Sequence, residues 1–301
     1  MYCEYFGLKE YPFSITPDTS YFFTSTASKQ GLNTLLVATE MGEGFIKVVG
    51  EIGTGKTLLC RKLIDTLQQR CKVAYIPNPY LSPAGLIEEI AIELGIHTED
   101  SPPRTPHQML RELNAFLIAE CQRGGKVVIC LDETQSMPVE SLEVLRLLSN
   151  LETGKRKLVQ VILFGQPELD DKLAQPDIRQ LRQRISFEYY LSGLSKLETA
   201  RYIGHRLVVS GHRGPPLFSG PALWLLHRAT RGVPRLINLY AHKALLSAYG
   251  KGKRQIGLPD VLASIIDTRS PRKARTSMTH LLGLLLACSS AWLSLGGTTP
   301  P

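Results

Sequence analysis

The stretch that decides the fold is Phe45–Thr57, which reads FIKVVGEIGTGKT. Phe45–Val49 is mostly apolar and β-branched and predicts a strand, and a helical pattern begins at Thr57. Between them, Gly50–Thr57 matches the pattern G-x-x-x-x-G-K-[ST]. Glycines let backbone N–H groups turn inward around a phosphate, and the helix N-terminus adds the positive end of its dipole. This order predicts a phosphate-binding loop; the alternative is a chance octapeptide on a surface loop.

Two side chains at the end of this loop carry the expected chemistry. Lys56 is expected to reach the β- and γ-phosphates of a nucleotide, and the Thr57 hydroxyl is expected to bind Mg²⁺. The pattern therefore predicts ATP and Mg²⁺ as cofactors. The predicted nucleotide-binding residues are Gly50, Glu51, Ile52, Gly53, Thr54, Gly55, Lys56, Thr57 and, from a later strand, Asp132.

Short apolar runs alternate with longer stretches of helical period along the first two thirds of the chain. Such alternation predicts a five-stranded parallel sheet covered by helices on both faces, a three-layer α/β sandwich. Strand patterns end near Leu191 and four helical segments follow, so we expect an α/β domain at 1–192 and a small all-α lid at 193–268. The predicted strands are Phe45–Val49, Val73–Pro77, Val127–Asp132, Leu158–Phe164 and Ile185–Leu191, and the lid helices are Lys196–Ser210, Gly220–Thr230, Pro234–Tyr249 and Leu258–Thr268.

Helix starts are predicted by two local signals in the first domain. Ser82 stands before Pro83, and Thr105 stands before Pro106. Hydroxyl side chains favour the position that caps a helix, and proline favours the first helical position. We therefore expect helices to begin at these two points.

Two acids end the third predicted strand, at Asp132 and Glu133. Carboxylates at the tip of a buried strand are costly unless they serve a cation. We expect Asp132 to hold Mg²⁺ through its water shell and Glu133 to act as the base that orients the attacking water. An isolated pair of acids would be an ordinary strand end, and the phosphate-binding loop is what favours the catalytic interpretation.

Two further polar residues are candidates for sensing the nucleotide. Gln166 follows the fourth strand, where it would sense the γ-phosphate or the water, although a glutamine beside Pro167 is also typical of an ordinary turn. Arg235 is the second residue of a predicted helix that starts at Pro234. The helix dipole disfavours a cation there, and a bound phosphate would offset that cost; an exposed arginine is the alternative.

Arginines precede the fifth strand at Arg179, Arg182 and Arg184. Such residues can reach the nucleotide of a neighbouring subunit and stabilise the charge of the transition state. This interpretation predicts a homo-oligomer, whereas the alternative is a solvated helix face.

Charge is divided unevenly along the chain. Residues 1–198 carry 21 Lys and Arg against 25 Asp and Glu, a net charge of −4, whereas residues 199–301 carry 14 against 2, a net charge of +12. A basic C-terminal third suits a polyanion, an acidic protein or an anionic membrane face. The six cysteines have neither disulfide-framework nor zinc-site spacing, and the N-terminus lacks a secretory signal, so a cytoplasmic location is expected.

A hydrophobic run closes the sequence after a basic linker. Its apolar part is short for a membrane span, but Met278–Gly297 is long enough to reach across, and its apolar residues would cover all sides of a helix. The cations that precede it would keep the ATPase in the cytoplasm by the positive-inside rule. Within 269–301 we therefore expect a membrane anchor at 278–297, with a partner-binding helix or a disordered end as alternatives. The cations of the linker are Arg269, Arg272, Lys273 and Arg275.

Six separately placed motifs resemble the ExeA/GspA family of AAA+ secretion ATPases, over about residues 1–268. The resemblance implies an AAA+ fold, ATP hydrolysis, Asp132 and Glu133 as Walker B, Gln166 as a sensor-1-like residue, and Arg235 as sensor 2. Arg182 and Arg184 match the arginine pair of the family. One departure is Thr134 and Ser136, where the family often has Ala and Asn. The motifs are YFGLKEYPFSITPDTSYFF (5–23), GEIGTGKTLLCRKL (50–63), LDETQSM (131–137), FGQPEL (164–169), LRQRI (181–185) and GVPRLINLYAHKAL (232–245).

The same resemblance implies a role in assembling a cell-envelope machine. The most similar branch serves the mannose-sensitive haemagglutinin (MSHA) type IV pilus or its secretin, which implies a pilus or secretion assembly protein as partner at the cytoplasmic face of the bacterial inner membrane. A DNA-handling AAA+ ATPase of the transposition type is the alternative, because cations of the lid could contact DNA phosphates. No recognition helix or aromatic platform accompanies those cations.

Overall fold

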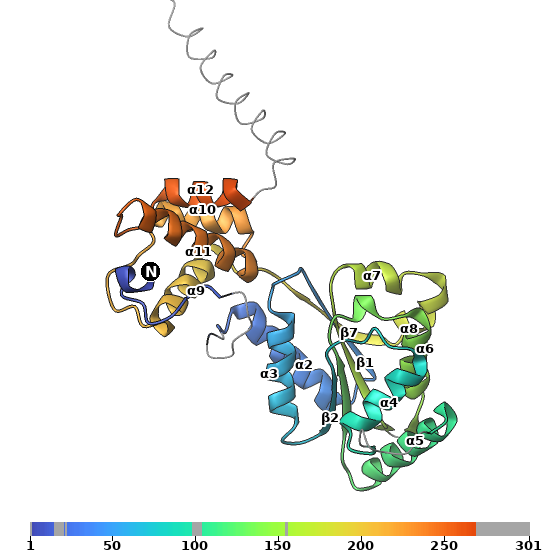
Figure 1. The fold of residues 1–301 in the computed structure, drawn as a ribbon. Helices are drawn as coiled ribbons and strands as arrows, with labels where there is room; N and C mark the ends of the chain where they lie inside the picture. The colour runs from blue at the N-terminus through green and yellow to red at the C-terminus, as the bar shows by residue number, and fades with distance from the viewer. Residues whose placement is uncertain (1, 15–20, 22, 98–103, 154–155, 269–301) are drawn as a thin grey trace, which may run out of the picture. The chain divides into compact units, whose positions relative to one another are not determined.

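The computed structural model describes residues 2–14, 21, 23–97, 104–153 and 156–268, which form two compact units (Figure 1). An α/β unit contains the described residues of Thr16–Glu198 together with Arg231–Leu236. A helical unit contains those of Met1–Ile15, Thr199–Thr230 and Ile237–Pro301. The predicted division assigns all of 1–192 to the α/β domain, and the structure differs because the N-terminal segment packs in the helical unit.

The sheet of the α/β unit has five strands, as predicted, and every neighbouring pair is parallel. The spatial order is β2-β3-β6-β1-β7. A small antiparallel hairpin, β4 (Glu152–Thr153) and β5 (Arg156–Lys157), stands apart from it. The five strands are β1 (Phe45–Gly50), β2 (Lys72–Ile76), β3 (Val127–Leu131), β6 (Gln160–Gly165) and β7 (Ile185–Leu191).

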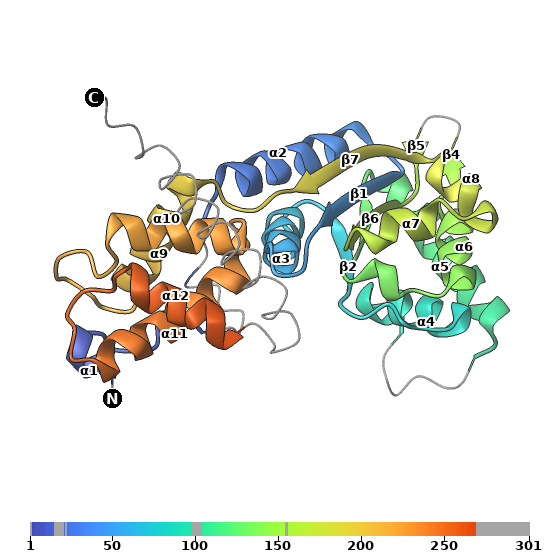
Figure 2. The same cartoon turned by 90° about the horizontal axis from the view of Figure 1, so that it is seen from above.

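Helices cover both faces of this sheet, so the unit has the three predicted layers (Figures 1 and 2). On one face, Leu59 and Leu63 pack with Ile162 and Phe164. On the other face, Leu86 packs in a cluster built by five helices. The first face is covered by α2 (Thr26–Met41) and α3 (Lys56–Leu67), and the second by α4 (Pro83–Glu93), α5 (Pro106–Gln122), α6 (Val139–Leu148), α7 (Glu168–Leu173) and α8 (Arg179–Arg182).

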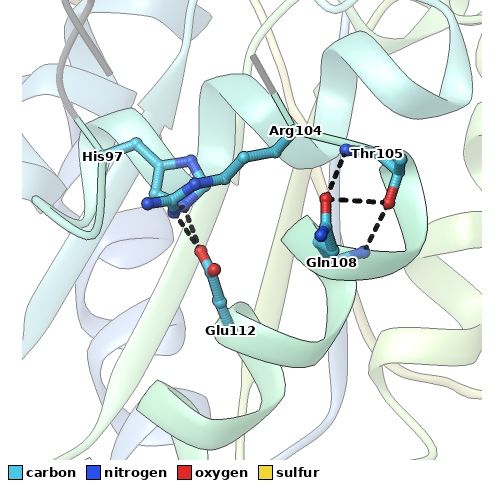
Figure 3. Close-up of polar contacts among 5 residues, drawn as sticks. All are labelled: His97, Arg104, Thr105, Gln108 and Glu112. Atoms are coloured by element: carbon cyan, nitrogen blue, oxygen red, sulfur yellow. Dashed lines mark hydrogen bonds and ion pairs between the residues drawn. The ribbon is translucent and has the colours of Figure 1, made fainter. Parts of the chain in front are cut away.

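The predicted starts of α4 and α5 are confirmed by their caps. The Ser82 side chain accepts the N–H of Gly85. Thr105 and Gln108 form a reciprocal capping box, in which each side chain accepts the backbone N–H of the other residue (Figure 3). These caps satisfy N–H groups that have no partner inside the helix.

A buried histidine ties the end of α4 to α5 (Figure 3). His97 Nε2 lies 2.6 Å from Glu112 Oε2, and Arg104 contacts the same carboxylate. The hydrogen bond from His97 is the main cause that holds the pKa of Glu112 below its ordinary value. The cluster thus joins two helices on either side of their connecting loop.

The helical unit confirms the four predicted helices and adds the N-terminal segment to them. Its first helix, α1 (Tyr2–Phe6), contacts α11 (Pro234–Gly250) through a hydrogen bond of Tyr2 Oη with His242 Nδ1, 3.0 Å long. Farther along, the Phe13 ring meets Phe218 edge-on. Burial of these aromatic rings therefore holds the N-terminal segment in the helical unit. The other helices are α9 (Lys196–Val209), α10 (Gly220–Thr230), α11 (Pro234–Gly250) and α12 (Leu258–Thr268).

No helix among these described residues is long and apolar enough to cross a membrane. The predicted anchor at 278–297 lies outside the described residues, as does the basic linker that precedes it.

Gly232 provides a test of the backbone geometry of the α/β unit. Its φ is 76°, and an added Cβ would lie 1.9 Å from the carbonyl oxygen of Leu194. We expect Gly232→Ala to lower the free energy of unfolding by about 1–3 kcal/mol, measured from urea unfolding followed by circular dichroism. Gly204→Ala is the control, because Gly204 lies within α9 with nothing within 4 Å of an added Cβ. It should stabilise by up to about 1 kcal/mol. Equal midpoints for both variants would contradict this description.

Candidate nucleotide-binding site

The phosphate-binding loop connects β1 directly to α3 and is closed around the ammonium of Lys56. Lys56 is 4% exposed, and its Nζ donates to the carbonyl oxygens of Gly50 (2.7 Å) and Glu51 (3.1 Å). Burial lowers the pKa of Lys56, and the nearby carboxylates of Glu133 and Asp132 oppose that effect. A phosphate oxygen could replace the two carbonyls as the partner of this ammonium.

Arg235 lies against the same loop. Its backbone N–H donates to the carbonyl oxygen of Gly53 at 3.3 Å, and its side chain is exposed. Gly53 has a φ of 81°, and a Cβ there would lie 2.4 Å from the Cβ of Arg235. The glycine therefore permits the close approach that brings this predicted sensor to the loop.

Asp132 and Thr57, the two predicted Mg²⁺ ligands, lie in direct contact. Thr57 Oγ1 donates to Asp132 Oδ2 at 2.6 Å, and the N–H of Glu133 donates to Asp132 Oδ1 at 2.9 Å. Asp132 is 2% exposed, and this burial raises its pKa. Hydroxyl and carboxylate oxygens are the ligands that Mg²⁺ prefers, so the pair could hold this ion together with phosphate oxygens and water.

Other metal sites are absent from the described part of the chain, where no group of three or more His, Cys, Asp or Glu is placed to hold an ion. A single carboxylate beside a phosphate-binding loop fits an ion that arrives with a nucleotide. Metal sites that are built entirely from protein groups supply more ligands than a single carboxylate.

Glu133 adopts an unusual backbone conformation at the end of β3. Its φ is 51°, in the left-handed region that non-glycine residues rarely adopt. Its Oε2 accepts hydrogen bonds from the side-chain amides of Gln135 (2.5 Å) and Gln166 (2.8 Å). The structure therefore brings the predicted base and the predicted sensor-1-like residue together. Strain of this kind concentrates at functional sites.

Gln135 is the residue of this site that sequence reasoning missed. It lies in η2 (Thr134–Ser136), the short 3₁₀ turn after Glu133, and its Oε1 accepts the backbone N–H of Gln166 at 3.0 Å. The only signal in the sequence is its position two residues after Glu133. Its partner Gln166 directly follows another strand, β6, and the sequence pattern alone does not identify this pairing.

Arg182 and Arg184 lie far from this phosphate-binding loop. Phe45 pairs with Ile185 at the amino ends of β1 and β7. The residues before β7 therefore lie at the amino ends of the strands, whereas Gly50 lies at the carboxyl ends. The strands between these ends are about 20 Å long. Arg184 donates to Ser149 Oγ (3.0 Å), whereas Arg182, at the end of α8, is exposed.

Many cations of the basic stretch bind groups within the helical unit itself. Arg206 is 6% exposed and its Nε donates to the carbonyl oxygen of Pro12 at 2.5 Å. These contacts leave less charge for a polyanion than the sequence indicates. The others are Lys243 with Asp267, Lys251 and Lys253 with Asp260, and Arg254 with the ring and carbonyl oxygen of Tyr5.

Residues 39–173 match a family model described as an AAA domain. The chain has the fold of an AAA ATPase. General secretion pathway protein A of Aeromonas hydrophila is 38% identical over 297 residues, which cover 97% of this chain and 54% of that relative. The chain thus spans about half the length of that relative. The AAA domain supports ATP hydrolysis by this chain, and the similarity relates the chain to general secretion pathway protein A.

Solved AAA structures share the fold at low sequence identity. Cdc6p from Pyrobaculum aerophilum has a TM-score of 0.61 at 17% identity, covering 83% of this chain and 70% of that one. The Drosophila ORC bound to DNA has a TM-score of 0.61 at 16% identity, with coverages of 96% and 78%. The RuvB Holliday junction branch migration motor of Thermotoga maritima has 0.54 at 15%, with 85% and 72%. Such similarities establish the fold alone.

Asp132→Asn tests the electrostatics of the site. Because burial raises the pKa of Asp132, the native protein binds this proton more tightly than the unfolded chain, and stability falls as pH rises past the ordinary value. At pH 7 without nucleotide, the variant should therefore be more stable than the parent by about 1 kcal/mol. Urea unfolding measures this difference.

The same variant should bind ATP more weakly in the presence of Mg²⁺. Asp65→Asn is the control, since Asp65 is exposed on α3, and it should leave stability within about 0.5 kcal/mol of the parent. Loss of stability in Asp132→Asn would contradict the electrostatic explanation.

Proposed function

We propose that this chain is the ATPase module of a secretion or type IV pilus assembly system, working as a homo-oligomer with ATP and Mg²⁺. The observation that carries the proposal is the 38% identity to general secretion pathway protein A over 97% of the chain. The contact of Thr57 with Asp132, beside a base held at Glu133, supports hydrolysis by this chain.

Residues of the loop and of the strand ends supply the chemistry. Lys56 would bind the β- and γ-phosphates, and Thr57 and Asp132 would hold Mg²⁺, which would neutralise charge on the phosphate oxygens. Glu133 orients a water whose oxygen attacks the γ-phosphorus, and its carboxylate takes the proton as the bond to ADP breaks. Gln166 contacts this carboxylate, and Arg235 contacts the loop through its backbone.

Arg182 is the residue we assign to the neighbouring subunit's nucleotide. It is exposed at the sheet edge opposite to its own loop, so it cannot reach its own nucleotide. Arg184 precedes the same strand but is held by Ser149 Oγ and by the carbonyl oxygen of Arg146. Its role is therefore to fix the start of β7 against the end of α6.

Glu133→Gln tests the assignment of the base. The variant keeps the size of the side chain but cannot accept the proton, so ATP turnover should fall at least about 10²-fold while ATP stays bound. Phosphate release and binding of a fluorescent ATP analogue measure the two properties. Glu143→Gln, an exposed acid on α6, is the control and should turn over ATP normally. Unchanged turnover in Glu133→Gln would refute the role of this residue.

Mixing two inactive variants tests whether Arg182 acts on a neighbour. Alone, Arg182→Ala and Glu133→Gln should each turn over ATP slowly. For Arg182→Ala, turnover should be about 10³-fold lower than in the parent. In a mixed oligomer, an Arg182→Ala subunit keeps its base and receives an arginine from a Glu133→Gln neighbour, so turnover should return. Gln180→Ala, an exposed uncharged residue on the same helix, is the control and should keep turnover within about twofold. Failure of the mixture to recover would contradict action in trans.

The MSHA pilus is the finer setting that we propose. It rests on the resemblance of the six motifs to MshM, the ATPase of that system, and it implies a pilus assembly protein or the secretin machinery as partner. The same setting implies the cytoplasmic face of the inner membrane, with 278–297 as anchor.

Deletion of Ser277–Pro301 tests this setting. The full chain should fractionate with inner-membrane vesicles and the shortened chain should not, as measured by flotation. A full chain that stays in the soluble fraction and retards DNA at about 0.15 M salt would favour the DNA-handling alternative instead.

A further inference from the structure

Gln135 connects the two loops that carry the predicted base and the predicted sensor. Its side-chain Nε2 donates to Glu133 Oε2 at 2.5 Å, while its Oε1 accepts the backbone N–H of Gln166 at 3.0 Å. Gln166 closes the triangle, because its own Nε2 donates to the same oxygen of Glu133 at 2.8 Å. One amide therefore uses both its donor and its acceptor, on two residues that are 33 positions apart in the sequence.

A lysine holds Gln135 from the other side. Lys172, on α7, donates from Nζ to the carbonyl oxygens of Gln135 and Met137, each at 2.6 Å. Burial lowers the pKa of Lys172. Since α7 begins two residues after Gln166, the segment after β3 and the segment after β6 are joined by four hydrogen bonds.

We propose that Gln135 is a positioning residue, which together with Gln166 holds one carboxylate oxygen of Glu133 so that the other faces the attacking water. This inference rests on the proposed role of Glu133 as the base. In this role, Gln135 acts on the reaction through Glu133.

The physical reason lies in the freedom of a glutamate side chain. An unrestrained carboxylate samples several rotamers, and only a fraction of them places an oxygen correctly for proton transfer. Two N–H donors on Oε2 remove that freedom before ATP binds, and the left-handed backbone of Glu133 adds a second restraint. Among the contacts of the described residues, none occupies Oε1 of Glu133. Misplacement of a reacting group by about 1 Å costs on the order of 10²-fold in rate.

Three substitutions test the proposal in the full-length protein. Gln135→Ala removes the contact, and Gln135→Glu keeps the size of the side chain and its acceptor but loses the donor to Glu133. In both, kcat for ATP hydrolysis should fall about 10- to 100-fold, with KM and the affinity for a fluorescent ATP analogue within about twofold of the parent. Gln68→Ala is the matched control, because Gln68 is exposed at the end of α3. It should leave kcat unchanged.

A double-mutant cycle separates positioning from structural support. If Gln135 and Gln166 hold Glu133 as one unit, Gln135→Ala combined with Gln166→Ala should lose about as much kcat as either alone. Added to Glu133→Gln, Gln135→Ala should lower the residual rate no further. Equal unfolding midpoints for Gln135→Ala and the parent are also expected.

Other results would overturn the proposal. Unchanged or increased kcat would show that the contact does not position the base, and a Gln135→Glu variant with parental kcat would show that the donor is irrelevant. Loss of ATP affinity together with a lower unfolding midpoint would make Gln135 structural. These outcomes are distinct from failure of the proposed function, which would appear as normal turnover in Glu133→Gln itself.

Discussion

The site depends on the partly buried hydrogen bond from Thr57 Oγ1 to Asp132 Oδ2, which is 2.6 Å long. It joins the first turn of α3 to the end of β3 across 75 residues of sequence. A carboxylate in this position has lost its water, and its raised pKa expresses that loss. The hydroxyl of Thr57 and the N–H of Glu133 compensate in part. A cation arriving with a nucleotide would complete the compensation, which connects the local electrostatics to ligand binding.

Strand order explains how the remaining groups reach this contact. Because β1, β3 and β6 are parallel and adjacent, their carboxyl ends share one edge of the sheet, where ligands of open α/β sheets bind. The loops that follow them carry Lys56, Glu133 and Gln166. The same parallel arrangement places Arg182 at the opposite edge. The topology thus gathers the phosphate-binding groups of one subunit and separates them from Arg182 of the same subunit. This separation is the geometric reason for proposing that Arg182 acts on a neighbouring subunit.

Local and long-range features differ in how far the sequence predicts them. The three central strands, β1, β3 and β6, are predictable because parallel strands buried on both faces read as continuous apolar runs. The cap at Thr105 is predictable because its partner Gln108 lies within one helical turn. The phosphate-binding loop is local for the same reason. The partner of Gln135 depends instead on β3 and β6 being neighbours, and the aromatic contact of Phe13 with Phe218 spans the chain. Such pairings are set by topology, so no window of sequence contains both members.

The unfavourable features of this molecule are concentrated at one place. Asp132 and Lys56 are charged groups with almost no exposure, and Glu133 has a backbone conformation that costs a non-glycine residue free energy. These features do not favour stability. An apolar side chain in place of Asp132 or Lys56, or a relaxed turn at Glu133, would cost less free energy. The elements that carry these residues pack in buried clusters on both faces of the sheet, with Leu59 and Phe164 on one face. Rigid surroundings of this kind can hold charge and strain in place, and that is what positioning a water and a phosphate requires.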